Sequence, residues 1–86
     1  MFRMTVDDVF FIRGRGTVLT GKVEVGPISI GEEVWLNGRG PLRIDGIEAF
    51  RKTLDQAEAG QNIGLLLRDL DRDEVKRGDV VSSGGL

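Results

Sequence analysis

The chain contains, at residues 14–24, the segment GRGTVLTGKVE. Residues 17–25 alternate with the two-residue period of a β-strand, in which every second side chain lies on the same face. An earlier apolar run, residues 6–12, ends at the glycine-containing segment 13–16. The pattern therefore predicts two successive strands joined at residues 13–16.

Glycines, of which there are 13, separate the remaining apolar runs. Asn37-Gly38 predicts a tight hairpin turn, because both residues tolerate a positive φ. Further strands are expected at residues 28–31 leading into 33–36, and at 42–50, 61–68 and 80–82. The connections are expected to be a loop or short turn of helix at 51–60 and a charged segment at 69–79 with one helical turn around 73–76. About six short strands predict an all-β barrel or sandwich.

The composition excludes several classes of protein. With 86 residues, 40% of them hydrophobic and 30% charged, the chain is expected to form one globular domain, residues 1–86, with a small core. It contains no cysteine and no histidine, which removes disulfides, thiolate metal sites and the commonest general base. We therefore expect neither an enzyme nor a bound metal or cofactor. A net charge of −2 excludes a generally cationic surface, so any nucleic-acid site must be local. Arg13 and Arg15 are interpreted as solvated loop charges, and phosphate contacts are the alternative.

Two segments come close to known ligand-binding motifs. Residues 16–22 fit most of the phosphate-binding pattern G-x-x-x-x-G-K, but Val23 stands where a serine or threonine would hold Mg²⁺. Residues 69–73 resemble the start of a calcium loop, but Glu74 replaces its required glycine and Val80 its bidentate glutamate. Neither segment predicts a site.

Strand alternation turns some apolar side chains away from the core. Val18 and Leu66 fall at outward positions, and one of the adjacent residues Phe10 and Phe11 must also leave the core. These side chains are candidates for an exposed apolar patch of the kind that often marks an interaction site. The alternative is that neighbouring loops cover them.

Several segments of the chain occur in the order seen in a known family. Beside residues 8–12 and GRGTVLTGKVE, they are GEEV (31–34), GIEAFRK (46–52), AGQNIG (59–64) and RGDVV (77–81). Together they resemble domain 2 of translation elongation factor Tu over residues 6–82. Phe11 departs from the family pattern, because a smaller residue is more usual at that position.

The resemblance implies a fold and a function. The fold would be a closed six-stranded antiparallel β-barrel. The function would be that of a non-catalytic module that binds the aminoacylated 3′ end of tRNA in GTP-dependent elongation, in the cytoplasm and with the GTPase domain absent from these residues. The implied partners are the tRNA acceptor end, bound weakly by the barrel alone, and the GTPase domain or another protein. The ribosome is left open as a partner and no membrane is expected. The alternative is a free-standing barrel used for protein–protein interaction.

The resemblance also implies the residues of the tRNA site. The pocket for the terminal adenosine would be formed by Ile12, Gly14, Val18, Leu66 and Glu48. In this pocket the carboxylate would accept a hydrogen bond from a ribose hydroxyl. The aminoacyl group would be contacted by Asp8, Phe10 and Asn62. The implied outward phenylalanine is thus Phe10 rather than Phe11.

Structural roles remain open for some of these residues. Ile12 and Val18 could be barrel packing, since β-branched side chains fit a pleated surface with or without a ligand. Glu48 could pair with Arg51 or Lys52 across a turn.

Overall fold

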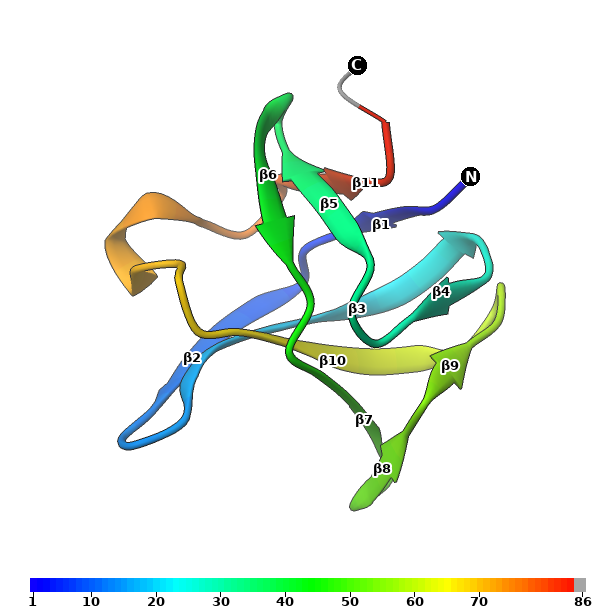
Figure 1. Cartoon of the computed structure of the whole chain (residues 1–86), viewed down its shortest axis with the longest axis horizontal. Helices are drawn as coiled ribbons and strands as arrows, with labels where there is room; N and C mark the ends of the chain where they lie inside the picture. The colour runs from blue at the N-terminus through cyan, green and yellow to red at the C-terminus, as the bar shows by residue number, and fades with distance from the viewer. Residues whose placement is uncertain (85–86) are drawn as a thin grey trace.

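The computed structural model describes residues 1–84 and consists almost entirely of β-strands (Figure 1). In chain order the strands are β1 (Arg3–Thr5), β2 (Asp8–Ile12), β3 (Gly16–Val25), β4 (Ile28–Ser29), β5 (Glu33–Leu36), β6 (Arg39–Arg43), β7 (Gly46–Ala49), β8 (Lys52–Leu54), β9 (Gln56–Ala57), β10 (Asn62–Leu67) and β11 (Val80–Ser82). Within the described residues one 3₁₀-helix, η1 (Arg72–Glu74), lies between β10 and β11. The all-β fold class is confirmed.

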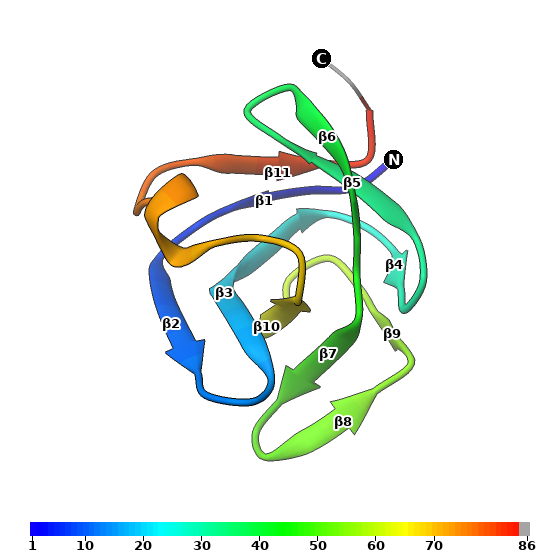
Figure 2. The ribbon, with the colours of Figure 1, turned by 60° about the vertical axis from the view of Figure 1, so that its left-hand side comes forward.

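Nine of these strands form one curled antiparallel sheet (Figure 2). Its order is β6-β5-β11-β1-β3-β10-β7-β8, and β2 is an additional partner of β3. The ten-residue β3 is long enough to pair with β1 and β2 in succession along one side, while β10 pairs along its other side. The short strands β4 and β9 form a separate antiparallel pair.

The curled sheet encloses a hydrophobic core. Its largest fully buried side chains are Phe2, Met4, Leu19, Ile28, Leu36, Ile44, Ile47, Leu65, Leu67, Val6, Val23 and Val34. Ile28 and Ala57 bring the β4–β9 pair against the same cluster. The two sheets therefore share one core, whose burial is the main favourable term in folding.

The strands are more numerous and shorter than the six expected. Residues 42–50 divide between β6 and β7, because Ile44 enters the core and the amide of Asp45 donates to the carbonyl of Leu66 at 2.8 Å. Residues 51–60 contain β8 and β9 rather than a loop or helical turn. Strand β1 was not expected from the sequence, since it has three residues and no turn signal before it. The expected helical turn exists, but as η1 at residues 72–74.

The Asn37-Gly38 hairpin turn is confirmed between β5 and β6. Both residues have a positive φ, 51° for Asn37 and 82° for Gly38. The Oδ1 atom of Asn37 also accepts a hydrogen bond from the amide of Val80 at 2.9 Å, which ties the turn to β11. In residues 1–84 there is no helix whose length and apolar content would let it span a membrane.

Replacing Asn37 by alanine should lower the free energy of unfolding by about 2 kcal/mol. About half of this comes from the poorer tolerance of alanine than of asparagine for a positive φ. The other half comes from the lost hydrogen bonds of the Asn37 side chain with Val80 and Asp79. Asn37→Gly is the matched control, because glycine accepts the φ angle but also loses the bonds, so it should lose only about 1 kcal/mol. Urea unfolding followed by the fluorescence of Trp35, the only tryptophan, measures both. Equal losses for the two variants would contradict the role of the φ angle.

Asp79 gives the fold a dependence on pH. Burial acts to raise the pKa of this carboxyl, but hydrogen bonds from Asn37 and the Lys76 amide, and the charges of Lys76 and Arg39, outweigh it and hold the pKa below its ordinary value of 3.8. Because the folded-state pKa is depressed, the stabilisation is present above the unfolded-state pKa and is lost as the pH falls through the folded-state pKa.

We therefore expect Asp79→Asn to flatten the decline in the free energy of unfolding below pH 3.8. The measurement is urea unfolding at a series of pH values for both proteins. Asp69→Asn is the control, since Asp69 is an exposed carboxylate on the same connection. An unchanged pH profile in Asp79→Asn would contradict the assignment.

Candidate functional site

Four adjacent strands have one face in the core and one face turned away from it. Val9, Leu19, Leu65 and Ile47 are directly opposed across β2, β3, β10 and β7. All four belong to the core cluster or pack against it. Because successive side chains in a strand point to opposite sides, the residues on either side of this row define the opposite face, which we call the outer face.

The register places four of the outer-face positions in one row. Phe10 on β2 lies opposite Val18 on β3, Val18 opposite Leu66 on β10, and Leu66 opposite Gly46 on β7. Three of these residues were predicted to contact the tRNA end, and they come from segments up to 56 positions apart in sequence. The sheet register is what brings them together.

A second row lies beside the first. It runs from Asp8 on β2 through Thr20 on β3 and Gly64 on β10 to Glu48 on β7. Two more of the predicted residues, Asp8 and Glu48, are therefore at opposite ends of this row.

The last three predicted residues flank these rows. Asn62, which lies opposite Lys22, is exposed at one end of β10. Ile12 is partly buried at the end of β2, and Gly14 lies in the following turn with φ 81°. The strand positions among the predicted residues thus share the outer face, and Gly14 lies at its border.

The predicted exposure of Val18 and Leu66 is wrong. Their exposed fractions are only 8% and 4%, although neither belongs to the main core cluster. Both lie on the outer face in the middle of a row, with a strand on each side. They pack within this face and offer little of their own surface to a ligand.

The choice of Phe10 as the phenylalanine on the outer face is confirmed, but the implied burial of Phe11 is wrong. Phe10 lies on the outer face and is 50% exposed, but Phe11, on the opposite face, is 56% exposed. Phe11 is on the same face of β2 as Val9, but it is not buried. In the described residues β2 pairs with β3 alone, and the core does not extend beneath the unpaired edge of β2.

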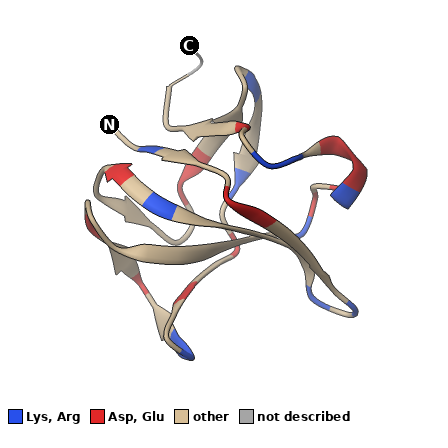
Figure 3. Ribbon diagram, turned by 180° about the vertical axis from the view of Figure 1, so that it is seen from behind, with Lys and Arg blue, Asp and Glu red and all other residues tan. Residues whose placement is uncertain are grey.

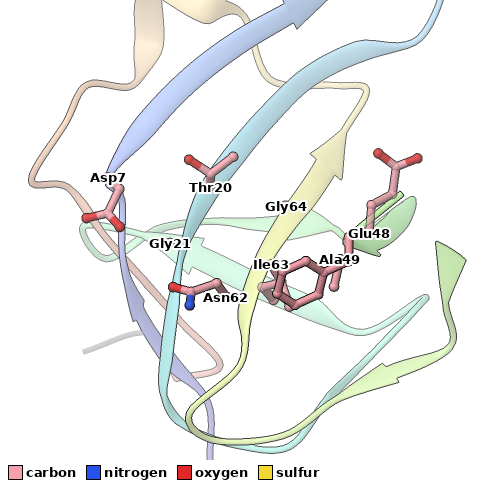
Figure 4. Close-up of a pocket in the computed structure, with 9 residues that line it drawn as sticks. Asp7, Thr20, Gly21, Glu48, Ala49, Asn62, Ile63 and Gly64 are labelled. Atoms are coloured by element: carbon pink, nitrogen blue, oxygen red, sulfur yellow. The ribbon is translucent and has the colours of Figure 1, made fainter. Parts of the chain in front are cut away.

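A shallow hollow of about 370 Å³ lies on the outer face. Gly64 is in its floor, with Thr20, Asn62 and Glu48 around it and Asp7 on the side away from Glu48 (Figure 4). A Cβ atom on residue 64 would lie 3.0 Å from the Cγ1 atom of Val18 and would fill part of the space. The glycine therefore keeps the hollow open.

Glu48 pairs with Arg15, and not with the neighbours Arg51 or Lys52 that the sequence had suggested. The Arg15 Nη2 and Glu48 Oε2 atoms are 2.8 Å apart, and the pair spans β3 and β10. Both side chains remain well exposed, 48% and 37%, so the pair adds at most about 1 kcal/mol of stability. In the described residues Oε1 has no hydrogen-bond partner, which leaves it available as an acceptor.

Basic residues lie at two hairpin ends that border the outer face. Figure 3 shows Lys and Arg at the end of the β2–β3 hairpin and at the end of the β7–β8 hairpin. The first carries Arg13 and Arg15, and the second carries Arg51 and Lys52. The outer face therefore has cationic borders although the chain has a net charge of −2.

The hollow also includes residues outside the predicted site. Thr20 has the same parity as Val18, so strand alternation could have placed it there. Phe50, which is 89% exposed, follows β7 at a φ of 50°. No pattern in the sequence predicts the turn at Phe50, because a positive φ is uncommon for a bulky residue.

The family comparison agrees with this arrangement. Residues 16–82 match the family described as elongation factor Tu domain 2. The match includes β3, β10 and β7, which carry most of the outer face, and begins after β2. A curled antiparallel sheet with these segments in this order is thus a domain of known type: the chain belongs to the elongation factor Tu domain 2 family.

Proposed function

We propose that the outer face binds the aminoacylated 3′ end of tRNA, as a non-catalytic module of a cytoplasmic translation factor. The observation that carries the proposal is the sheet register, which puts Phe10, Glu48 and Asn62 from three separate strands on one face. Glu48 and Asn62 line the hollow on that face. Family membership supports the same class of ligand. The GTPase domain and the ribosome are the proposed protein and assembly partners.

The burial of Val18 and Leu66 changes how the terminal adenosine would be held. The apolar surface that remains open on this row is the half-exposed ring of Phe10. The resemblance assigned Phe10 to the aminoacyl group, but here its ring would instead stack on the base, a contact that contributes about 1–3 kcal/mol. Glu48 Oε1 would accept from a ribose hydroxyl, and the carboxamide of Asn62 would meet the aminoacyl end. Arg15 would hold the Glu48 carboxylate in place through its bond to Oε2.

We also propose that the curled sheet and the β4–β9 pair together form the closed six-stranded barrel that the resemblance implies. The β4–β9 pair supports this, since it packs on the same core. A hydrogen bond from the Ile30 amide to the Asp55 carbonyl, 3.0 Å, extends the pair. A bond from the Gly31 amide to the Ile44 carbonyl, 2.9 Å, joins it to the connection between β6 and β7.

Titration with a hydrolysis-resistant aminoacyl-adenosine amide tests the site. One open aromatic ring and a few polar groups must offset the entropy of association, so we expect a Kd of about 1 mM. Amide NMR signals of Phe10, Glu48, Asn62 and Leu66 should shift on binding. Unchanged signals at high millimolar ligand would remove the assignment.

The hydrogen bond between Glu48 and a ribose hydroxyl is tested with two ligands and two variants. An analogue without the ribose hydroxyls should bind the parent chain about 3–10-fold more weakly, the value of one typical hydrogen bond at a solvent-accessible position. In Glu48→Ala the acceptor is missing, so the analogue and the complete ligand should bind this variant equally weakly. Glu33→Ala on β5 is the matched control and should keep the preference for the complete ligand. A preference retained by Glu48→Ala would contradict this role.

A further inference from the structure

The free edge of β2 is a feature that the candidate site does not use. In residues 1–84, β2 pairs only with β3. Its further backbone hydrogen bonds in these residues run to β3 and to its own hairpin turn, while η1 comes near it without a backbone bond. Arg77 donates through Nε to the carbonyl of Asp7 at 2.8 Å, so the free edge begins at Asp8. An unpaired edge offers N–H and C=O groups to another strand.

The edge has little protection against pairing: the Val9 amide donates to the Oδ1 atom of exposed Asp8 at 2.9 Å, a local contact that a paired strand would replace. Natural edge strands carry lysine, proline or a bulge that blocks a second strand. Residues 9–12 are Val-Phe-Phe-Ile, with no charge and no proline. Phe10 and Phe11 expose 50% and 56% of their surface on opposite faces of this strand. A strand added here would cover apolar surface on both faces.

The charges around the edge complement one another in the antiparallel direction. Asp7 and Asp8 lie at the start of β2, and Arg13 and Arg15 follow its end. Asp7 and Arg13 are exposed and form no ion pair within the described residues. If two copies of β2 pair antiparallel about Phe10, Asp7 of each copy faces Arg13 of the other.

The same antiparallel pairing also places apolar residues of the two copies opposite each other. Pairing about Phe10 places Val9 of one copy opposite Phe11 of the other, and the two Phe10 residues opposite each other at the axis. Aromatic and β-branched cross-strand pairs are among the favourable ones. A two-fold interface needs a self-complementary patch of this kind.

We propose that a second copy of this chain pairs with β2 through its own β2, antiparallel and centred on Phe10, to form a two-fold dimer. The pairing extends the sheet across the axis and brings the two outer faces side by side. It depends on Phe11 and on charges at both ends of β2. Phe10 belongs both to the dimer axis and to the proposed tRNA site. Phe11, on the opposite face, belongs to the dimer alone, so a change at Phe11 tests the dimer separately from the tRNA site.

Sedimentation equilibrium of the 86-residue chain tests the proposal. We expect a reversible monomer–dimer equilibrium within the range of roughly 10 µM to 1 mM. Phe11→Lys should weaken it by about tenfold or more, because it places a cation on the edge. Phe50→Lys is the matched control: it removes an equally aromatic and more exposed side chain that follows β7, which β3 and β10 separate from β2. It should leave the equilibrium unchanged. Amide NMR spectra establish that both variants are folded.

A charge exchange identifies the antiparallel register. Asp7→Arg and Arg13→Asp should each be monomeric, since each brings like charges together twice in the dimer. Mixing the two variants should restore a dimer, because both arginines of the first variant then face aspartates of the second. A parent chain that stays monomeric at roughly 1 mM, a dimer that survives Phe11→Lys, or a mixture that stays monomeric would overturn the proposal.

Discussion

Gly21→Ala should lower the free energy of unfolding by about 3 kcal/mol or more, which corresponds to a fall in Tm of roughly 12–24 °C for a domain of this size. Gly21 lies on β3 where β1 passes beside it, and a Cβ atom there would be 2.4 Å from the carbonyl oxygen of Thr5. It would also be 3.0 Å from the Cγ atom of Met4, which is fully buried. Neither the backbone of β1 nor the core side chain can move aside without loss of packing.

Gly46→Ala is the matched control for this prediction. Gly46 is also a strand glycine, and its added Cβ would lie 3.4 Å from the nearest atom, the Cβ of Leu66, which is an ordinary contact. We expect a change within about 0.5 kcal/mol. Thermal unfolding followed by circular dichroism and urea unfolding followed by Trp35 fluorescence measure both variants. Similar stabilities for the two alanine variants would contradict the close approach of β1 and β3.

Leu66→Ala should cost about 2–3 kcal/mol, although Leu66 points away from the main core. The side chain is 4% exposed and lies opposite Val18, so its removal leaves a cavity in the outer face. A leucine on an open apolar surface would instead change the stability by less than about 0.5 kcal/mol. The free energy of unfolding measured in urea therefore shows whether Leu66 is a buried packing residue or an exposed contact for a ligand.

Phe50→Ala provides the comparison for Leu66→Ala. Phe50 is 89% exposed at the rim of the hollow, so its truncation should leave the free energy of unfolding within about 0.5 kcal/mol of the parent. A cost near zero for Leu66→Ala would contradict the burial of this row. A large cost for Phe50→Ala would show that the hollow is packed differently.

The candidate site was predictable from the sequence only in part. The alternation of β3 and β10 assigns Val18, Leu66 and Asn62 to one side of their strands, and the register confirms that these positions share a face. Alternation does not report what covers a side chain, so it failed on the exposure of Val18 and Leu66. It also could not join Arg15 to Glu48, since that contact depends on the order of the strands in the sheet.

The amino-acid sequence by itself determined the all-β class, the hairpin turn at Asn37-Gly38 and the family, because these depend on local patterns: alternation, positive-φ residues and the spacing of glycines. The tertiary structure alone decided that Phe10, Gly64 and Glu48 meet on one face, that Val18 and Leu66 are buried within it, and that β2 keeps a free edge. Those properties arise from strand order and register, which pair residues distant in the chain. Local patterns carry no information about which strand becomes the neighbour.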